Sequence, residues 1–250
     1  MDEAKLERVA VSFEEAPIPE QASELPHVEI LFPFAEQRIR LAKAPRYRVR
    51  LKIARWELVE GKREVEVSLD GQRPVLLTDP KRTLRLEDLV PEDGELNAGE
   101  HTLFAVAVDG TGQRVRPGGS SQAPFAIVHF WVGERAKPRE DPDAPAVFYG
   151  RPRGTYNGEQ VAAKILLDYY LLNVELSATG PRLEVTLRGT GVEGRTMLDS
   201  WKPLFIKGLP SGDHRVTLRL VDAQGRTLEH PGASVEQVIT VNRDAPVVDR

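Results

Sequence analysis

Two histidines occupy matching places in two similar stretches of the chain. His101 follows Gly-Glu and His214 follows Gly-Asp, and after each an alternating apolar run closes on an aspartate, Asp109 or Asp222. Histidine and aspartate in a fixed order are side chains that acid–base catalysis uses. A residue that recurs at the start of the same strand in two copies more simply serves the turn, by hydrogen bonding to the neighbouring loop. We therefore predict a structural role for both histidines.

The two aspartates are each followed closely by a glycine, Gly112 or Gly225. This pattern is typical of hairpin turns, in which the aspartate caps its own backbone and the glycine takes a positive φ. A calcium loop needs several more oxygen ligands in close spacing, and a zinc site needs clustered histidines. The sequence has neither, so we predict no metal site and no cofactor.

An enzyme would need acidic side chains that only the fold could bring together, for example Asp70, Asp109 and Glu87. A serine nucleophile elbow and a phosphate-binding loop are missing from the sequence. We therefore name no catalytic residue and expect a protein that is not an enzyme.

The repeated stretches, residues 97–112 and 209–225, indicate a duplicated fold. The chain has 250 residues, which is enough for two domains of ordinary size. Short segments of alternating polarity are separated by Gly and Pro turns, and no long helix is predicted. The predicted fold class is therefore all-β, with two tandem immunoglobulin- or fibronectin-like antiparallel β-sandwich domains.

Several segments carry this prediction. The clearest strand alternates basic and apolar residues from Arg46 to Trp56, which gives it one wet face. A second strand, residues 64–69, ends in the hairpin signal Asp70-Gly71. Residues 160–172 fit a helix or a buried strand. Because they take the place of residues 47–56 in the other copy, we predict a central strand with a short helical turn near Val161.

The sequence also predicts the domain boundaries. Residues 1–27 are acidic and proline-bearing, and we expect an N-terminal tether or extended arm, favouring a tether over a sheet element although Val11 and Phe13 alternate. The first sandwich is expected over 28–133 and the second over 146–250. Residues 134–145 are charged and proline-rich, as is typical of an interdomain linker.

Composition narrows the choice of partner. With 34 basic and 38 acidic residues the net charge is −4, so no strong positive field attracts nucleic acid or an anionic membrane. No stretch is long and apolar enough to span a bilayer, and no signal peptide is visible. We expect membrane contact only through a lipid anchor on a segment removed from the N-terminus.

One glycine-rich loop concentrates residues suited to binding. Tyr149, Arg151, Arg153 and Tyr156 lie close together there, where arginines can hold a phosphate or carboxylate and aromatic rings can stack on a sugar or peptide. The alternative is a surface turn with aromatic anchors, which we favour. Trp201 is either a recognition residue or a cover over the core, and we favour burial.

The C-terminal half resembles a group of bacterial envelope lipoproteins often labelled phosphopeptide-binding proteins. Four segments carry the resemblance: residues 148–158, 166–173, 201–203 and 208–214. The resemblance implies an exported, anchored, non-catalytic sandwich protein, located in the periplasm or at the cell surface.

Our leading hypothesis is an extracytoplasmic binding or scaffold protein that docks to another cell-envelope protein or membrane-protein complex. The alternative is a carbohydrate- or phosphopeptide-binding module that uses the predicted site residues, Tyr149, Arg151, Arg153, Tyr156 and Trp201.

Overall fold

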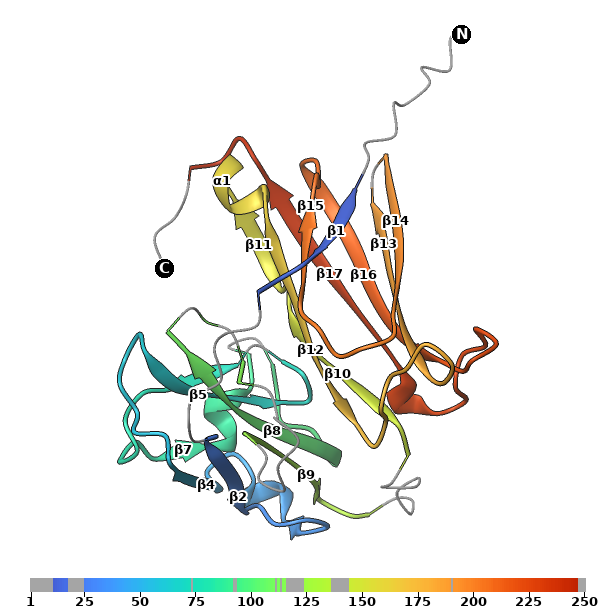
Figure 1. The fold of residues 1–250 in the computed structure, drawn as a ribbon. Coiled ribbons are helices and arrows are strands. Elements are labelled where there is room, and N and C mark those ends of the chain that lie inside the picture. The colour runs from blue at the N-terminus through green and yellow to red at the C-terminus, as the bar shows by residue number, and fades with distance from the viewer. Residues whose placement is uncertain are drawn as a thin grey trace, which may run out of the picture. The chain divides into compact units, whose positions relative to one another are not determined.

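The structure is a computed structural model that describes residues 11–17, 25–72, 74–91, 94–110, 112, 114–115, 124–135, 144–189 and 191–246 (Figure 1). The chain divides into two compact units. The N-terminal unit comprises residues 19–140, and the C-terminal unit comprises residues 1–18 together with 141–250. Most of the predicted linker, 134–145, lies outside the described residues, and the domain boundaries stay a prediction.

The described residues of the N-terminal unit form eight strands in two sheets. One sheet has the order β2-β4-β7 and the other β3-β9-β8-β5-β6, and among these strands only the β3–β9 pair is parallel. Short 3-10 turns, η1 (Leu41–Lys43) and η2 (Leu86–Leu89), follow β3 and β7. The strands are β2 (His27–Phe32), β3 (Arg38–Ile39), β4 (Arg48–Ala54), β5 (Arg63–Leu69), β6 (Val75–Leu77), β7 (Leu84–Arg85), β8 (Gly99–Asp109) and β9 (Phe125–Val132).

The part of the C-terminal unit that the structure describes has nine strands. Its sheets have the orders β1-β15-β12-β10 and β11-β17-β16-β13-β14, and again one pair, β11–β17, is parallel. One turn of helix, α1 (Glu159–Ala162), precedes β12, and a 3-10 turn, η3 (Pro231–Ala233), precedes β17. The strands are β1 (Ser12–Glu15), β10 (Ala146–Arg151), β11 (Gly154–Asn157), β12 (Ile165–Leu172), β13 (Arg182–Gly189), β14 (Val192–Leu198), β15 (Leu204–Lys207), β16 (Gly212–Val221) and β17 (Ser234–Asn242).

The two units repeat one topology. Strands β2 to β9 correspond in order to β10 to β17, because each set forms a three-stranded and a five-stranded group with the same neighbours and the same single parallel pair. The protein is therefore all-β, with two tandem immunoglobulin- or fibronectin-like sandwiches, which confirms the predicted fold class. Strand β1 has no counterpart in this correspondence.

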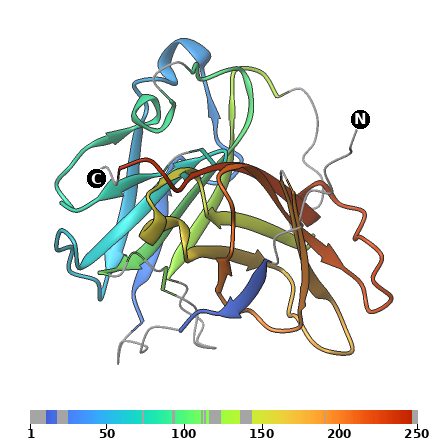
Figure 2. The same ribbon diagram turned by 90° about the horizontal axis from the view of Figure 1, so that it is seen from above.

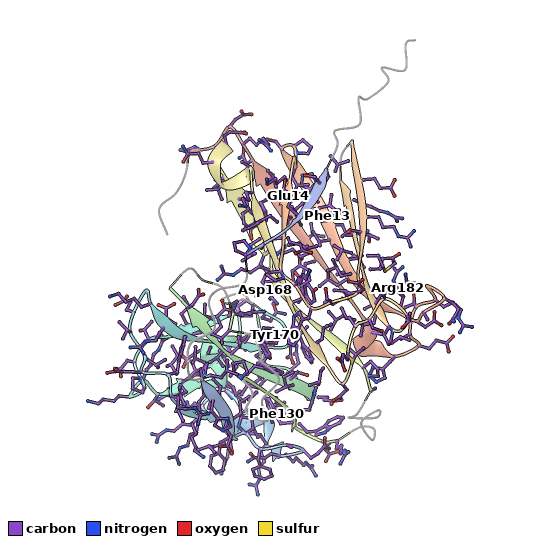
Figure 3. All side chains as sticks on the ribbon, in the orientation of Figure 1. Phe13, Glu14, Phe130, Asp168, Tyr170 and Arg182 are labelled. Carbon is purple, nitrogen blue, oxygen red and sulfur yellow. The ribbon has the colours of Figure 1, made fainter. Side chains whose placement is uncertain are left out.

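Alternation of side chains builds each core. On β4, Val49 is buried while Arg48 and Arg50 are exposed, as the period of two requires. On β16 the buried residues His214, Val216, Leu218 and Leu220 again stand two apart, and Val221 at the end of the strand is buried as well. The core of the N-terminal unit centres on fully buried residues such as Phe130 (Figure 3), Leu86, Leu89 and Leu103.

The ambiguous segment 160–172 is resolved as predicted. Residues Ile165–Leu172 form β12, the counterpart of β4, and α1 (Glu159–Ala162) supplies the helical turn near Val161. The Asp70-Gly71 turn is confirmed as well, because both residues have positive φ, 50° and 68°, and join the paired strands β5 and β6.

The N-terminal arm departs from expectation. Ser12–Glu15, inside the segment expected to be a tether, forms β1 and pairs antiparallel with β15. The preference for a tether over a sheet element is therefore wrong for these residues. The alternation of Val11 and Phe13 was the sequence signal, and both side chains pack against the core of the C-terminal unit.

Each unit also buries a glutamate at the same position of its topology. Glu66 on β5 is 2% exposed and pairs with Arg114 at 2.7 Å, and Arg114 is itself 4% exposed. Its counterpart Glu184 on β13 pairs with Arg195 on β14 and with Arg219 on β16. A buried carboxylate needs such partners because its desolvation is costly.

We predict that Arg114→Met destabilises the N-terminal unit by about 3–5 kcal/mol, because it leaves the charge of Glu66 buried without its ion-pair partner. Urea unfolding, followed by the fluorescence of Trp56 and Trp131, measures the loss. The double variant Glu66→Leu with Arg114→Met should recover much of it.

The matched control is Arg63→Ala, which removes an exposed ion pair with Glu57 at 3.7 Å and should cost about 0–1 kcal/mol. Equal losses for Arg114→Met and the control would contradict a structural role of the buried pair.

Candidate functional site

The repeated histidines make the same bond in both units. The Nε2 atom of His101 lies 2.9 Å from the carbonyl oxygen of Asn97, and that of His214 lies 2.8 Å from the carbonyl oxygen of Pro210. Each acceptor stands four residues earlier, in the loop that leads into the strand. The predicted structural role, hydrogen bonding to the neighbouring loop, is confirmed.

The two histidines differ in their second ring nitrogen. His101 Nδ1 lies 2.6 Å from Asp70 Oδ2, and its ring stacks on Phe130 with the centroids 5.6 Å apart. Burial alone lowers the pKa of His101, but the hydrogen bonds to Asp70 and the Asn97 carbonyl, with the charge of Asp70, raise it above its ordinary value. In the C-terminal unit, Nδ1 of His214 is buried without a hydrogen-bond partner.

The two aspartate turns also match. Gly112 donates to the carbonyl of Asp109 at 2.9 Å, and Gly225 donates to that of Asp222 at 3.0 Å. Both glycines have positive φ, 75° and 80°, as predicted. The backbone amide of Arg226 donates to the Asp222 carboxylate and lowers its pKa, helped by the Arg226 side chain. Within the described residues, no three acidic or histidine side chains gather closely enough to hold a metal ion.

Hydrogen bonds between its own residues hold the predicted binding loop, residues 149–158. The guanidinium of Arg153 donates to the carbonyls of Tyr149 at 2.6 Å and Gly150 at 2.8 Å, and its amide donates to the hydroxyl of Tyr156. Tyr149 is 5% exposed, and burial raises the pKa of its hydroxyl well above the ordinary value, helped by Tyr156 and opposed by Arg153. Arg151 faces Asp168 across the β10–β12 pair. The ligand role of this loop stays a prediction.

Trp201 contacts β12, the strand that pairs with β10. Its indole donates to the carbonyl of Tyr169 at 2.9 Å, and its ring meets the ring of Tyr170 edge-on at 5.2 Å. Tyr170 is fully buried on β12 (Figure 3). Trp201 is also partly buried against the core of the C-terminal unit, as the favoured interpretation of it as a cover over the core requires. Its role in ligand recognition stays a prediction.

The loop has a counterpart that sequence comparison missed. Topology places residues 149–158 where the β2–β3 turn stands in the N-terminal unit, and Phe32 faces Arg50 in register where Arg151 faces Asp168. The two copies differ in the chemistry of this facing pair. The N-terminal unit has the aromatic ring of Phe32 opposite Arg50, whereas the C-terminal unit has Arg151 opposite the carboxylate of Asp168.

An open depression of about 650 Å³ lies at this place in the N-terminal unit. Strand β4, the segment around η1 and the end of β2 converge on it. Arg50 lies over the ring of Phe32 at 5.9 Å from its centroid, and Tyr47 accepts a hydrogen bond from Gln37 at 2.6 Å. Its lining residues are Phe32, Ala42, Lys43, Arg46, Tyr47, Arg48 and Arg50.

The charge of this basic depression is uncompensated. Among the described residues, no carboxylate lies within ion-pair distance of the four cations Lys43, Arg46, Arg48 and Arg50. Two nearby acids are already paired: Glu29 on β2 with Lys52 at 3.2 Å, and Glu87 in η2 with Arg85 at 3.1 Å. Arg48 also stands opposite Arg85 in register, an arrangement of like charges that costs stability.

These residues suit binding of an anion. Arginine forks hold carboxylates and phosphates by paired hydrogen bonds, and the half-exposed rings of Phe32 and Phe34 offer apolar contact. Phe34 is 52% exposed, and its ring meets that of Phe32 edge-on at 6.4 Å. No carboxylate, histidine, serine or cysteine is among the lining residues, so they provide no general acid–base pair or nucleophile of those types.

Sequence reasoning recognised the basic face of β4 but not the site. The alternation from Arg46 to Trp56 predicts a wet face, and a solvated face is the ordinary meaning of such a pattern. Phe32 and Lys43 come from other segments, and their approach to β4 depends on the β2–β4 pairing. The sequence signal that could have revealed the site is the absence of acidic residues between Ile39 and Ile53.

Comparison with known proteins adds little beyond these observations. No protein-family model and no curated protein sequence matches the chain. Among solved structures, the fibronectin(III)-like modules of CbhA from Clostridium thermocellum share 15% identity over 86% of this chain and 94% of theirs, with a TM-score of 0.29. The chicken interferon gamma receptor alpha chain shares 13% over 88% and 100%, with a TM-score of 0.26.

A Ca²⁺-stabilized adhesin that helps an Antarctic bacterium bind ice shares 11% identity over 90% of this chain and 50% of its own, with a TM-score of 0.25. Such low scores carry no argument about function, and the fold class rests on the strand pairing. Among the described residues, no helix is long and apolar enough to cross a membrane.

We predict that His101 makes stability depend on pH through Asp70. Since the folded state raises the pKa of His101, its stabilising contribution is full below the ordinary value of about 6.5 and is lost as the pH rises through the folded-state pKa. Asp70→Asn keeps an acceptor for the amide of Thr102 but removes the charge. Urea unfolding across this pH range should show wild type and variant differing most in acid and converging in base. Parallel pH profiles would contradict the assignment.

Proposed function

We propose that the protein is a non-catalytic binding protein that docks an acidic peptide segment of another protein at the basic depression. The observation that carries this proposal is the group of four cations around exposed aromatic rings, with no carboxylate partner among the described residues. Like charges without carboxylate partners lower stability, and a ligand that neutralises them would offset this cost.

The shape of the site supports a peptide segment. The depression is open to solvent and has apolar rings at one side and cations along the exposed face of β4. An extended acidic segment can lie across such a surface with carboxylates on the arginines and an apolar side chain against Phe32. A net charge of −4 gives the chain as a whole no strong positive field that would attract nucleic acid.

Arginine side chains bind carboxylates and phosphates by the same paired hydrogen bonds, so a phosphorylated peptide could bind at the basic depression in the same way as an acidic one.

We further propose an extracytoplasmic setting, in which the partner is another cell-envelope protein or membrane-protein complex. Support for that setting is the resemblance of residues 148–158, 166–173, 201–203 and 208–214 to envelope lipoproteins.

We predict that Arg48→Gln with Arg50→Gln weakens binding of acidic peptides by at least about tenfold. Each charge-assisted hydrogen bond contributes about 1.5–3 kcal/mol, and 1.4 kcal/mol is a tenfold change in affinity. Fluorescence anisotropy would compare a labelled glutamate-rich peptide, its phosphoserine counterpart and a neutral glutamine counterpart. The glutamate-rich or the phosphoserine peptide should bind, with an affinity that falls as salt is added, and the neutral glutamine peptide should not bind.

The matched control is Arg188→Gln with Arg215→Gln, which changes the net charge equally on exposed strands of the C-terminal unit. This control should bind like the wild type. Removing Arg48 and Arg50 relieves like-charge repulsion and should leave the free energy of unfolding equal to or above that of the wild type. The control loses the exposed ion pairs of Arg188 with Glu193 and of Arg215 with Glu236, which should cost about 0–1 kcal/mol per pair. Equal loss of binding in both variants, or none in either, would overturn the proposal.

A further inference from the structure

Strand β1 is an addition to the repeated fold. Strands β10 to β17 already reproduce the complete topology of β2 to β9, and in the described part of the N-terminal unit the corresponding sheet ends at β7. In Figures 1 and 2, β1 lies beside the orange strand β15. The edge of β15 therefore receives a strand that the fold does not otherwise require.

The backbone contacts are those of an edge-docked strand. Ser12 pairs with Lys207 and Glu15 with Leu204 at the two ends of the register, and the amide of Ala16 donates to the carbonyl of Pro203 at 2.9 Å. Such pairing extends a sheet without altering the strand that receives it.

Apolar side chains of β1 fill the space between the two sheets. The ring of Phe13 lies so near Gly194 of β14 that a Cβ there would stand 3.1 Å from it, and Val11 lies 3.5 Å from the same point. Gly194 leaves room for the docked strand. Phe13 and Val11 stand two apart, so both point to the same face and close this side of the sandwich.

The exposed charges of β1 and its receiving edge are complementary. Glu15 pairs with Lys202 at 2.7 Å, and Glu14, which Figure 3 labels beside Phe13, pairs with Lys207. The receiving edge thus selects a short strand in which apolar residues at alternate positions are followed by two acids.

We propose that this receiving edge also binds β1 of a second copy of the chain, giving a strand-exchanged dimer. Every contact above joins β1 to β14, β15 or the segment before β15, and none depends on which chain supplies the strand. The N-terminal unit separates β1 from these strands in the sequence. Exchange of an identical element preserves its contacts and is a low-cost route to dimers.

The sequence contains no cysteine, so introduced cysteines are the only thiols available for disulfide formation. Full-length Ser12→Cys is mixed with full-length Lys207→Cys, unfolded and refolded together, and oxidised, and non-reducing electrophoresis measures the covalent heterodimer. The two positions face each other in register, so exchange brings the thiols of different chains together. We expect several-fold more heterodimer than from Ser12→Cys mixed with Arg215→Cys, whose cysteine lies on exposed β16.

Phe13→Ser added to the Ser12→Cys chain should reduce the heterodimer to the level of that control. The double variant Ser12→Cys with Lys207→Cys should give linked dimers in a fraction that rises with protein concentration. A heterodimer no more abundant than in the control mixture, with the double variant linked only within monomers, would overturn the proposal.

Discussion

Alternation of side chains along each strand is the constraint on which the structure depends. In a two-layer sandwich, one face of every central strand must supply the core, so residues such as Val49 and Val216 are committed to packing. Only outward faces and loops are free to vary between the copies. On the outward face of β4 the chain carries arginines, whereas on the outward face of β12 it carries Tyr170 beneath Trp201.

The repeated histidines and aspartate turns belong to the shared framework of the two units, in which the residue types cannot vary freely. His101 and His214 fasten the loop before the long strands β8 and β16, and the glycine turns end those strands at matching positions. Chemistry is found where the copies diverge. The clearest divergence is Phe32 facing Arg50 in one unit, at the position where Arg151 faces Asp168 in the other.

Much of this fold could be predicted from the sequence because its signals are local. The alternation of β4 and β5, the turn at Asp70 and the repeated strand starts are each contained in a few consecutive residues. Strand β14 was not recognised, because Val192–Leu198 interrupts its apolar pattern with Gly194 and charged residues. The pairing of β1 joins residues nearly the whole chain apart, which no local pattern reveals.

The candidate site was hidden for the same reason. The arginines of β4 were visible in sequence as an exposed face, but their meeting with Phe32 and Lys43 depends on long-range strand pairing. The predicted loop at residues 149–158 was found by residue type alone. Residue type could not show that Arg153 is already bonded to backbone carbonyls or that Tyr149 is buried.

Mapping the binding surface by nuclear magnetic resonance tests the central claim most directly. Backbone amide signals of the ¹⁵N-labelled full-length protein would be followed during titration with a glutamate-rich peptide. If the acidic peptide binds at the basic depression, the changes in amide chemical shift should concentrate at Phe32 and at residues 42–50, and the signals of residues 149–158 should stay unchanged. Perturbations confined to residues 149–158 and Trp201, or none at any peptide concentration, would contradict it.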